Sequence, residues 1–305
     1  MQLNQAQQEA VDYVNGPCLV LAGAGSGKTR VITTKIVSLI NKHFIAPQQI
    51  CALTFTNKAA AEMRDRVKQE LGSERSSLIT ISTFHSLGLN ILKEESVALG
   101  LGRNFTLFDQ YDSFKLIKDI VREKFPQILV DNSEKTVIEE IATDISTWKT
   151  SLLRPEDIAV RTIRVQVYEA YQAYLSACNA ADFEDLIFKT TLLLRDNQAV
   201  RDKWSSYYKY ILVDEYQDTN ETQYQLLKYL TSKNKRFTVV GDDDQSIYAW
   251  RGARPENIKV LSNDFPDLKV IKLEQNYRST QHILNCANKL ISNNEHRFNK
   301  TFYTK

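Results

Sequence analysis

The sequence has no long apolar run, and this absence excludes one class of protein. The stretch without Asp, Glu, Lys or Arg near the N-terminus, residues 13–27, contains Asn15, Pro17 and several glycines. It therefore cannot form a membrane span of ~20 apolar residues. The first residues also lack a basic segment followed by an apolar one, so no secretory signal and no membrane attachment are predicted.

The sequence has few cysteines and a small net charge. The four cysteines (Cys18, Cys51, Cys178 and Cys286) lie far apart, with no spacing typical of a metal site or a disulfide framework. This scarcity favours a reduced, cytoplasmic compartment. A net charge of only +2 gives no overall signature of nucleic-acid binding, so any basic groove must arise from local arrangement.

What the chain does have is enough apolar residues for a substantial core. Hydrophobic residues make up 43% of the 305 residues, a length that favours two domains over one. Six short apolar segments predict the strands of a buried parallel sheet, and helical stretches at 28–41, 58–71 and 222–231 follow three of them. This alternation predicts a doubly wound α/β fold. The expected strands are 18–22, 50–55, 78–82, 210–213, 237–241 and 268–273.

The segment between the two groups of strands has a different pattern. Residues 134–149, 165–177 and 183–194 show helical periodicity, and no convincing strand is recognisable there. We therefore expect one α/β domain, formed by residues 1–86 and 205–279, with an all-helical domain inserted at 87–204. Residues 281–291 predict a single helix after the last strand.

The first apolar strand leads into a glycine-rich loop and then a helix. Residues 22–29, AGAGSGKT, match the phosphate-binding P-loop except that Ala22 replaces its first glycine. In such a loop, backbone N–H groups converge on phosphate oxygens, Lys28 reaches the β- and γ-phosphates, and Thr29 binds Mg²⁺. A glycine-rich turn without a ligand is the alternative. The predicted nucleotide-binding residues here are Ala22, Gly23, Ala24, Gly25, Ser26, Gly27, Lys28, Thr29 and Arg30.

A pair of carboxylates follows the strand at 210–213. Ligands of open α/β sheets lie at the carboxyl ends of the strands, which places Asp214 to hold Mg²⁺ and Glu215 to polarise an attacking water. Adjacent acids at an exposed strand end are common, so their significance here comes from their pairing with Lys28. The combination predicts nucleotide hydrolysis.

Several further segments carry a resemblance to a known family. Taken in order, they resemble the UvrD/Rep/PcrA helicases of superfamily 1A, and residues 16–21 and 253–257 are most similar to the bacterial Rep branch. The segments are 3–7 (LNQAQ), 54–60 (TFTNKAA), 83–86 (TFHS), 214–218 (DEYQD), 241–253 (GDDDQSIYAWRGA) and 273–279 (LEQNYRS).

The resemblance implies a RecA-like motor domain that uses ATP and Mg²⁺ to move 3′ to 5′ along single-stranded DNA. It implies that Gln7 contacts the edge of the adenine and Tyr277 its face, that Gln245 senses the γ-phosphate, and that Arg278 stabilises the transferring phosphoryl group. The implied partners are single-stranded and 3′-tailed duplex DNA, with a homodimer on DNA allowed. The implied role is replication restart or repair; no partner protein can be named.

A set of residues at or just beyond strand ends is suited to binding a single strand. An aromatic residue in such a position is often only the edge of the core. Beside polar groups, however, aromatic residues can stack on bases of any sequence. His85 is assigned a DNA or coupling contact by resemblance alone, and residues 182–186 (DFEDL) fit either a family motif or an acidic helix start. The set comprises Phe55, Asn57, Thr83, Phe84, His85, Tyr248, Trp250 and Arg251.

The family normally has a second motor domain, and residues 280–305 resemble only its start. We therefore expect the chain to be the N-terminal half of a helicase that, on its own, binds ATP and single-stranded DNA weakly and does not unwind duplex. One alternative is a binding module without turnover. Another is the helicase part of a RecB/AddA-type recombination nuclease, which the compact spacing disfavours.

Overall fold

The computed structural model describes residues 2–100, 102, 104–129, 133–254, 256–293 and 300–304. The chain divides into two compact units. The first contains residues 1–84, 202–219 and 227–305, and the second contains residues 85–201 and 220–226. Among the described residues, no helix is both long enough and apolar enough to cross a bilayer.

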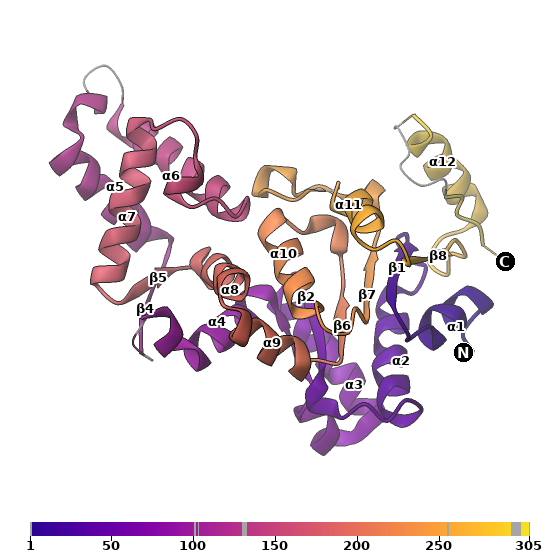
Figure 1. Cartoon of the computed structure of the whole chain (residues 1–305). Coiled ribbons are helices and arrows are strands. Elements are labelled where there is room, and N and C mark those ends of the chain that lie inside the picture. The colour runs from indigo at the N-terminus through magenta and orange to yellow at the C-terminus, as the bar shows by residue number, and fades with distance from the viewer. Residues whose placement is uncertain are drawn as a thin grey trace. The chain divides into compact units, whose positions relative to one another are not determined.

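A six-stranded sheet forms the centre of the first unit (Figure 1). Its strands are β1 (Pro17–Ala22), β2 (Ile50–Thr54), β3 (Thr80–Thr83), β6 (Tyr210–Val213), β7 (Phe237–Gly241) and β8 (Lys269–Leu273). They lie in the order β3-β2-β6-β7-β1-β8, and every pairing is parallel. The four inner strands are buried throughout, which explains their continuous apolar sequence. The edge strands β3 and β8 have exposed or partly exposed positions, so the expectation that all six strands are buried is wrong for them.

Helices surround this sheet, which confirms the predicted α/β fold class. Those lying wholly within the first unit are α1 (Gln5–Asp12), α2 (Lys28–Asn41), α3 (Asn57–Ser77), α11 (Asn257–Asp264) and α12 (Gln281–Ile291). Side chains of α1, α2 and α3, among them Val11, Ile32 and Met63, pack with Val20 and Leu212 of the sheet in one core. Helix α3 was expected to end at Leu71; it continues to Ser77 across a kink at Gly72, where φ is 80°.

The second unit is mainly helical. It contains α5 (Gln110–Lys124), α6 (Glu134–Thr150), α7 (Ile163–Ala177) and α8 (Asp185–Asp196), while α4 (Phe84–Glu94), α9 (Gln198–Tyr207) and α10 (Glu221–Leu230) include residues of both units. The expectation that this segment lacks strands is wrong. Strands β4 (Thr106–Phe108) and β5 (Ala180–Asp182) pair in parallel. Three residues are too few to establish an alternating pattern in the sequence.

A buried lysine joins β5 to two helices of the second unit. The ammonium of Lys149 in α6 contacts Oδ2 of Asp182 and lies 2.8 Å from Oδ1 of Asp185. Tyr171 Oη donates to Asp182 Oδ2 at 2.9 Å. Burial opposes the charge of Lys149, but the two carboxylates outweigh it and raise its pKa. Asp182 and Asp185 of segment 182–186 are therefore paired in the interior, and favourable placement at a helix start describes these two acids incompletely.

Candidate nucleotide and DNA site

The loop between β1 and α2 has the geometry of an anion-binding nest. Gly25 and Gly27 have φ values of +78° and +90°, in the left-handed region that favours glycine. A Cβ on Gly25 would also lie 2.6 Å from the Cβ of Arg278, so no larger residue fits. Gly27 precedes α2, and within the described part of the chain no side chain caps that helix start. Its N–H groups are suited to an anionic ligand.

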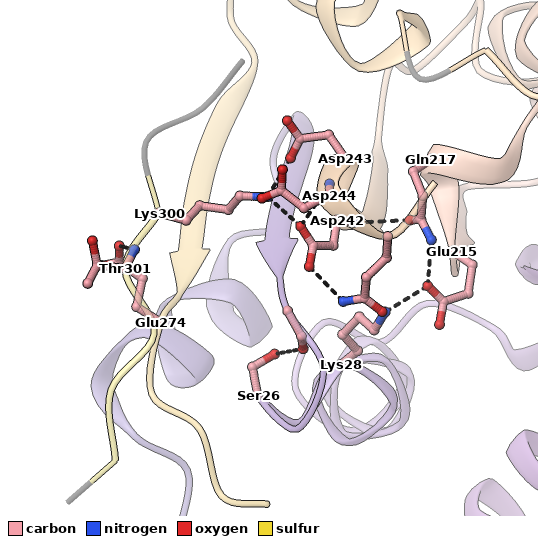
Figure 2. Close-up of polar contacts among 12 residues, drawn as sticks. Ser26, Lys28, Glu215, Gln217, Asp242, Asp243, Asp244, Glu274, Lys300 and Thr301 are labelled. Atoms are coloured by element: carbon pink, nitrogen blue, oxygen red, sulfur yellow. Dashed lines mark hydrogen bonds and ion pairs between the residues drawn. The ribbon is translucent and has the colours of Figure 1, made fainter. Parts of the chain in front are cut away.

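The P-loop lysine and the acid that follows β6 meet in this structure. Lys28 Nζ lies 2.7 Å from Glu215 Oε2, and the two side chains are 12% and 38% exposed. Glu215 has φ +50°, an uncommon backbone conformation for a residue with a side chain. Gln217 Nε2 donates to the same Glu215 oxygen at 2.9 Å (Figure 2). The predicted pairing of Lys28 with the acids after β6 is thus realised in space.

The neighbouring carboxylates suit a divalent cation. Burial raises the pKa of Asp214 to about 6, and the charge of Glu215 adds to the effect. The pKa of Asp218 is raised to about 6 for the same two reasons. These groups hold more negative charge than the single ammonium of Lys28 offsets. Oxygen ligands of this kind fit Mg²⁺, and the hydroxyl-bearing Thr29 is the second residue of α2, directly after Lys28.

Gln7 forms a hydrogen bond with the backbone of the phosphate loop. Its side chain is buried, Nε2 donates to the backbone oxygen of Ser26 at 2.9 Å, and Oε1 accepts from the backbone N–H of Asn4 at 3.0 Å. The adenine contact expected of Gln7 stays a prediction. Tyr277 is 45% exposed, and its hydroxyl accepts from Asn4 Nδ2 at 2.9 Å, which places its ring near Gln7's helix.

The segment after β8 also forms hydrogen bonds with the backbone of the phosphate loop. Asn276 Nδ2 donates to Ala24 O at 2.6 Å, and the Tyr277 N–H donates to Gly25 O at 2.9 Å. Asn276 Oδ1 accepts from the N–H groups of Arg278 and Ser279. Sequence reasoning did not single out Asn276, although it lies within the NYRS segment that carried the resemblance. Arg278 is exposed and lies against Gly25.

A chain of polar side chains connects Glu215 to Gln245. Gln217 donates to Glu215, and its Oε1 accepts from the backbone N–H of Asp242 at 3.0 Å. Asp242 Oδ2 in turn accepts from Gln245 Nε2 at 2.6 Å. Figure 2 shows Gln217 between Glu215 and Asp242. Gln217 was not among the predicted site residues, although it lies in the DEYQD segment, and its contacts connect Glu215 after β6 to Asp242, the partner of Gln245.

Three of the four predicted aromatic residues lie together. Phe55 and Tyr248 stack with ring centroids 5.5 Å apart, and Tyr248 lies 6.4 Å from Trp250. Trp250 is 74% exposed. The prediction for Phe84 is wrong as a stacking surface, because this first residue of α4 is only 2% exposed.

The polar members of the set differ in exposure. Asn57 is exposed at the start of α3, whereas Thr83 is buried at the end of β3. In the second unit, His85 stacks on Phe183 with centroids 4.0 Å apart, and burial lowers its pKa to about 4. His85 is therefore neutral at pH 7 and offers no charge to a phosphate. The side chain of Arg251 lies outside the described part of the chain.

The comparisons with known proteins cover nearly all of the chain. The family profile of the UvrD/REP helicase N-terminal domain matches residues 3–266. The chain belongs to the UvrD/REP helicase family. This confirms the resemblance predicted from the motifs.

Named members of the UvrD/REP family align along the entire chain. It is 52% identical to the ATP-dependent DNA helicase Rep of Escherichia coli, covering 100% of this chain and 45% of that protein. It is 47% identical to Rep of Buchnera aphidicola subsp. Baizongia pistaciae, with the same two coverages. It is 43% identical to the ATP-dependent DNA helicase PcrA of Staphylococcus aureus (strain Mu50), over 99% of this chain and 41% of that protein. The chain thus spans less than half the length of these relatives.

Proposed function

We propose that this chain is the ATP-hydrolysing motor part of a DNA helicase that moves 3′ to 5′ along single-stranded DNA. The observation that carries the proposal is the 2.7 Å contact between Lys28 and Glu215, beside a glycine nest at the carboxyl edge of a parallel sheet. A phosphate-binding cation and a candidate base meet there at one point. The relatives named ATP-dependent DNA helicase support the DNA part of the proposal.

Lys28 and Glu215 change partners in the proposed reaction. In the nucleotide-free arrangement each neutralises the other. When ATP binds, the ammonium of Lys28 turns to the β- and γ-phosphate oxygens, and Glu215 becomes available to accept a proton from the attacking water. Thr29 and Asp214 would hold Mg²⁺, which supplies charge neutralisation at the phosphates. Arg278 and the backbone of the loop residues 22–30 complete the proposed phosphate contacts.

The remaining predicted residues take supporting roles in this proposal. Gln7 and Tyr277 border the base of the nucleotide. Gln245 is linked to Glu215 through Asp242 and Gln217, and it passes the state of the γ-phosphate on to the DNA side. Residues 1–86 and 205–279 form the proposed motor domain, 87–204 the insert, and 280–305 the start of a second motor domain. DNA with a 3′ single-stranded tail is the proposed substrate.

Phe55, Tyr248 and Trp250 form the proposed base-stacking platform. Trp250→Ala should weaken binding of single-stranded DNA by ~1–3 kcal/mol, similarly for all sequences, because a stacking contact does not depend on base identity. The slope of log affinity against log salt should change little, since no phosphate contact is removed. Fluorescence anisotropy with labelled oligonucleotides over a series of salt concentrations measures both quantities.

The control for this variant is Tyr111→Ala in α5. Tyr111 and Trp250 are both 74% exposed, but Tyr111 does not belong to the platform. Its removal should leave DNA affinity unchanged. A reduced salt slope in Trp250→Ala, with normal affinity at low salt, would mean that Trp250 only supports a basic groove.

Strand separation by the complete gene product tests the function directly. Duplexes that carry a fluorophore and quencher, with either a 3′ or a 5′ single-stranded tail, are mixed with ATP and Mg²⁺. We expect separation of the 3′-tailed duplex only. Preference for the 5′ tail would contradict the proposed direction, and binding of ATP and DNA without turnover would instead support a binding module.

A further inference from the structure

Residues 300–304 lie along the segment that follows β8. The Tyr303 N–H donates to Glu274 O at 3.1 Å, and Tyr303 O accepts from the Asn276 N–H at 2.7 Å. Asn288 of α12 exchanges two hydrogen bonds with the backbone of Phe302. These bonds fix the segment beside Asn276, the residue that supports the phosphate loop.

Lys300 extends from this segment into an acidic triplet. Its ammonium contacts the carboxylates of Asp242 and Asp243 and lies 3.0 Å from Asp244 Oδ2 (Figure 2). The side chains of Lys300, Asp242 and Asp243 are 2%, 3% and 6% exposed. Burial opposes the charge of Lys300, but the carboxylates outweigh it and raise the pKa of the ammonium.

The triplet needs a cation at this place. One carboxylate oxygen from each of Asp242, Asp243 and Asp244 lies within 4.8 Å of the others. At such separations ionised carboxylates repel one another strongly unless a positive charge lies between them. Lys300 supplies that charge from a residue 56 or more positions away in the sequence.

Asp242 links Lys300 to the residue expected to sense the nucleotide. One carboxylate oxygen, Oδ1, binds the Lys300 ammonium, while Oδ2 accepts from Gln245 Nε2 at 2.6 Å. Two residues after Lys300, Phe302 lies against the phosphate loop: a Cβ on Gly23 would be 2.3 Å from its ring. One short segment therefore contacts both the acidic triplet and the P-loop.

We propose that Lys300 is a positioning residue for ATP hydrolysis. Through its contact with Oδ1, the Lys300 ammonium fixes the orientation of the Asp242 carboxylate, so that Oδ2 holds the amide of Gln245 in place. Residues 300–304 thereby tie the position of Gln245 to that of the P-loop. The inference rests on the proposed ATPase function and adds a residue that none of the predicted motifs contains.

The test compares Lys300→Ala, Lys300→Arg and a control, Lys289→Ala, which removes an exposed lysine of α12. For each variant of the complete gene product, ATP affinity, kcat and KM for ATP, and stimulation by single-stranded DNA are measured. Lys300→Ala should bind ATP normally, with kcat reduced about 10- to 100-fold, the range for one hydrogen bond to a charged group. Lys300→Arg should recover most of kcat, and the control should equal the unmodified protein.

A double variant separates positioning from simple charge balance. Lys300→Gln with Asp243→Asn has the same net charge as the unmodified cluster and serves if Lys300→Ala fails to fold. We expect the double variant to remain slow, because Asp242 still lacks its ammonium partner. Normal kcat in the double variant, or in a folded Lys300→Ala, would overturn the inference. An unmodified protein without ATPase activity would refute the proposed function itself, and the inference with it.

Discussion

Lys28→Ala should reduce ATP hydrolysis in the presence of saturating single-stranded DNA by at least ~10²-fold, the loss typical for removal of one group that stabilises developing charge. Lys28 is the only positively charged residue in the loop sequence 22–29 (AGAGSGKT). Its removal leaves the phosphates without that charge and leaves Glu215 without its 2.7 Å partner. A coupled assay of steady-state ATP turnover measures the effect.

Lys42→Ala is the matched control for this experiment. Lys42 caps the other end of α2, its side chain is 63% exposed, and its ammonium lies 3.7 Å from Asp12 Oδ1. Exposed pairs of this kind contribute little to stability. The control should therefore turn over ATP at the normal rate. Near-normal turnover by Lys28→Ala itself would refute the P-loop assignment.

Glu215→Gln should retain nucleotide binding while hydrolysis slows by ~10²–10⁴-fold, because an amide cannot accept the proton of the attacking water. The substitution also removes the charge that holds Lys28 in the nucleotide-free arrangement. ATP affinity should therefore be at least as high as in the unmodified protein. Equilibrium titration with a fluorescent ATP analogue and single-turnover hydrolysis separate the two effects.

Glu62→Gln provides the comparison, since Glu62 is an exposed residue of α3 and does not belong to the proposed site. Both ATP affinity and hydrolysis should be normal in that variant. If Glu215→Gln lost ATP affinity while bound ATP was still hydrolysed at the usual rate, Glu215 would be a binding residue and another group would have to act as the base.

The sequence was sufficient to predict the phosphate loop and the acids facing it, because both depend on local pattern. A buried strand followed by glycines and a lysine is a local pattern that identifies the loop. Parallel strands have their carboxyl ends at the same edge of the sheet, which places the acids near that loop. The same reasoning located β6, β7, α2 and α12 with their observed bounds. The edge strands differed from the expectation in burial, since an edge position exposes one side of the strand. The bounds of β1 and β2 differ by one residue, and α3 runs past its expected end at Leu71 to Ser77.

Contacts between distant residues could not be predicted in this way. Lys300 and Asp242 are 58 positions apart, and Asn276 and Ala24 are 252 apart, so no spacing rule connects them. Phe55 and Phe84 both follow strand ends, yet Phe84 begins a helix and is buried, whereas Phe55 is partly exposed and stacks on Tyr248. The position of a residue in the sequence does not determine the direction in which its side chain points, and that direction decides whether an aromatic ring is exposed to solvent.

The lysine buried in the second unit restricts how this sequence can change over evolutionary time. Lys149 and Asp185 are completely enclosed, and Asp182 nearly so. Losing the lysine alone would remove the ammonium partner of Asp182 and leave Asp185 with the more distant ammonium of Lys189, 3.5 Å from its Oδ2. Losing one aspartate would leave the other to hold the buried ammonium of Lys149. Positions 149, 182 and 185 should therefore change together or not at all among related sequences, because a protein with only one of these substitutions is less stable. In an alignment they should appear as correlated columns that lie far apart.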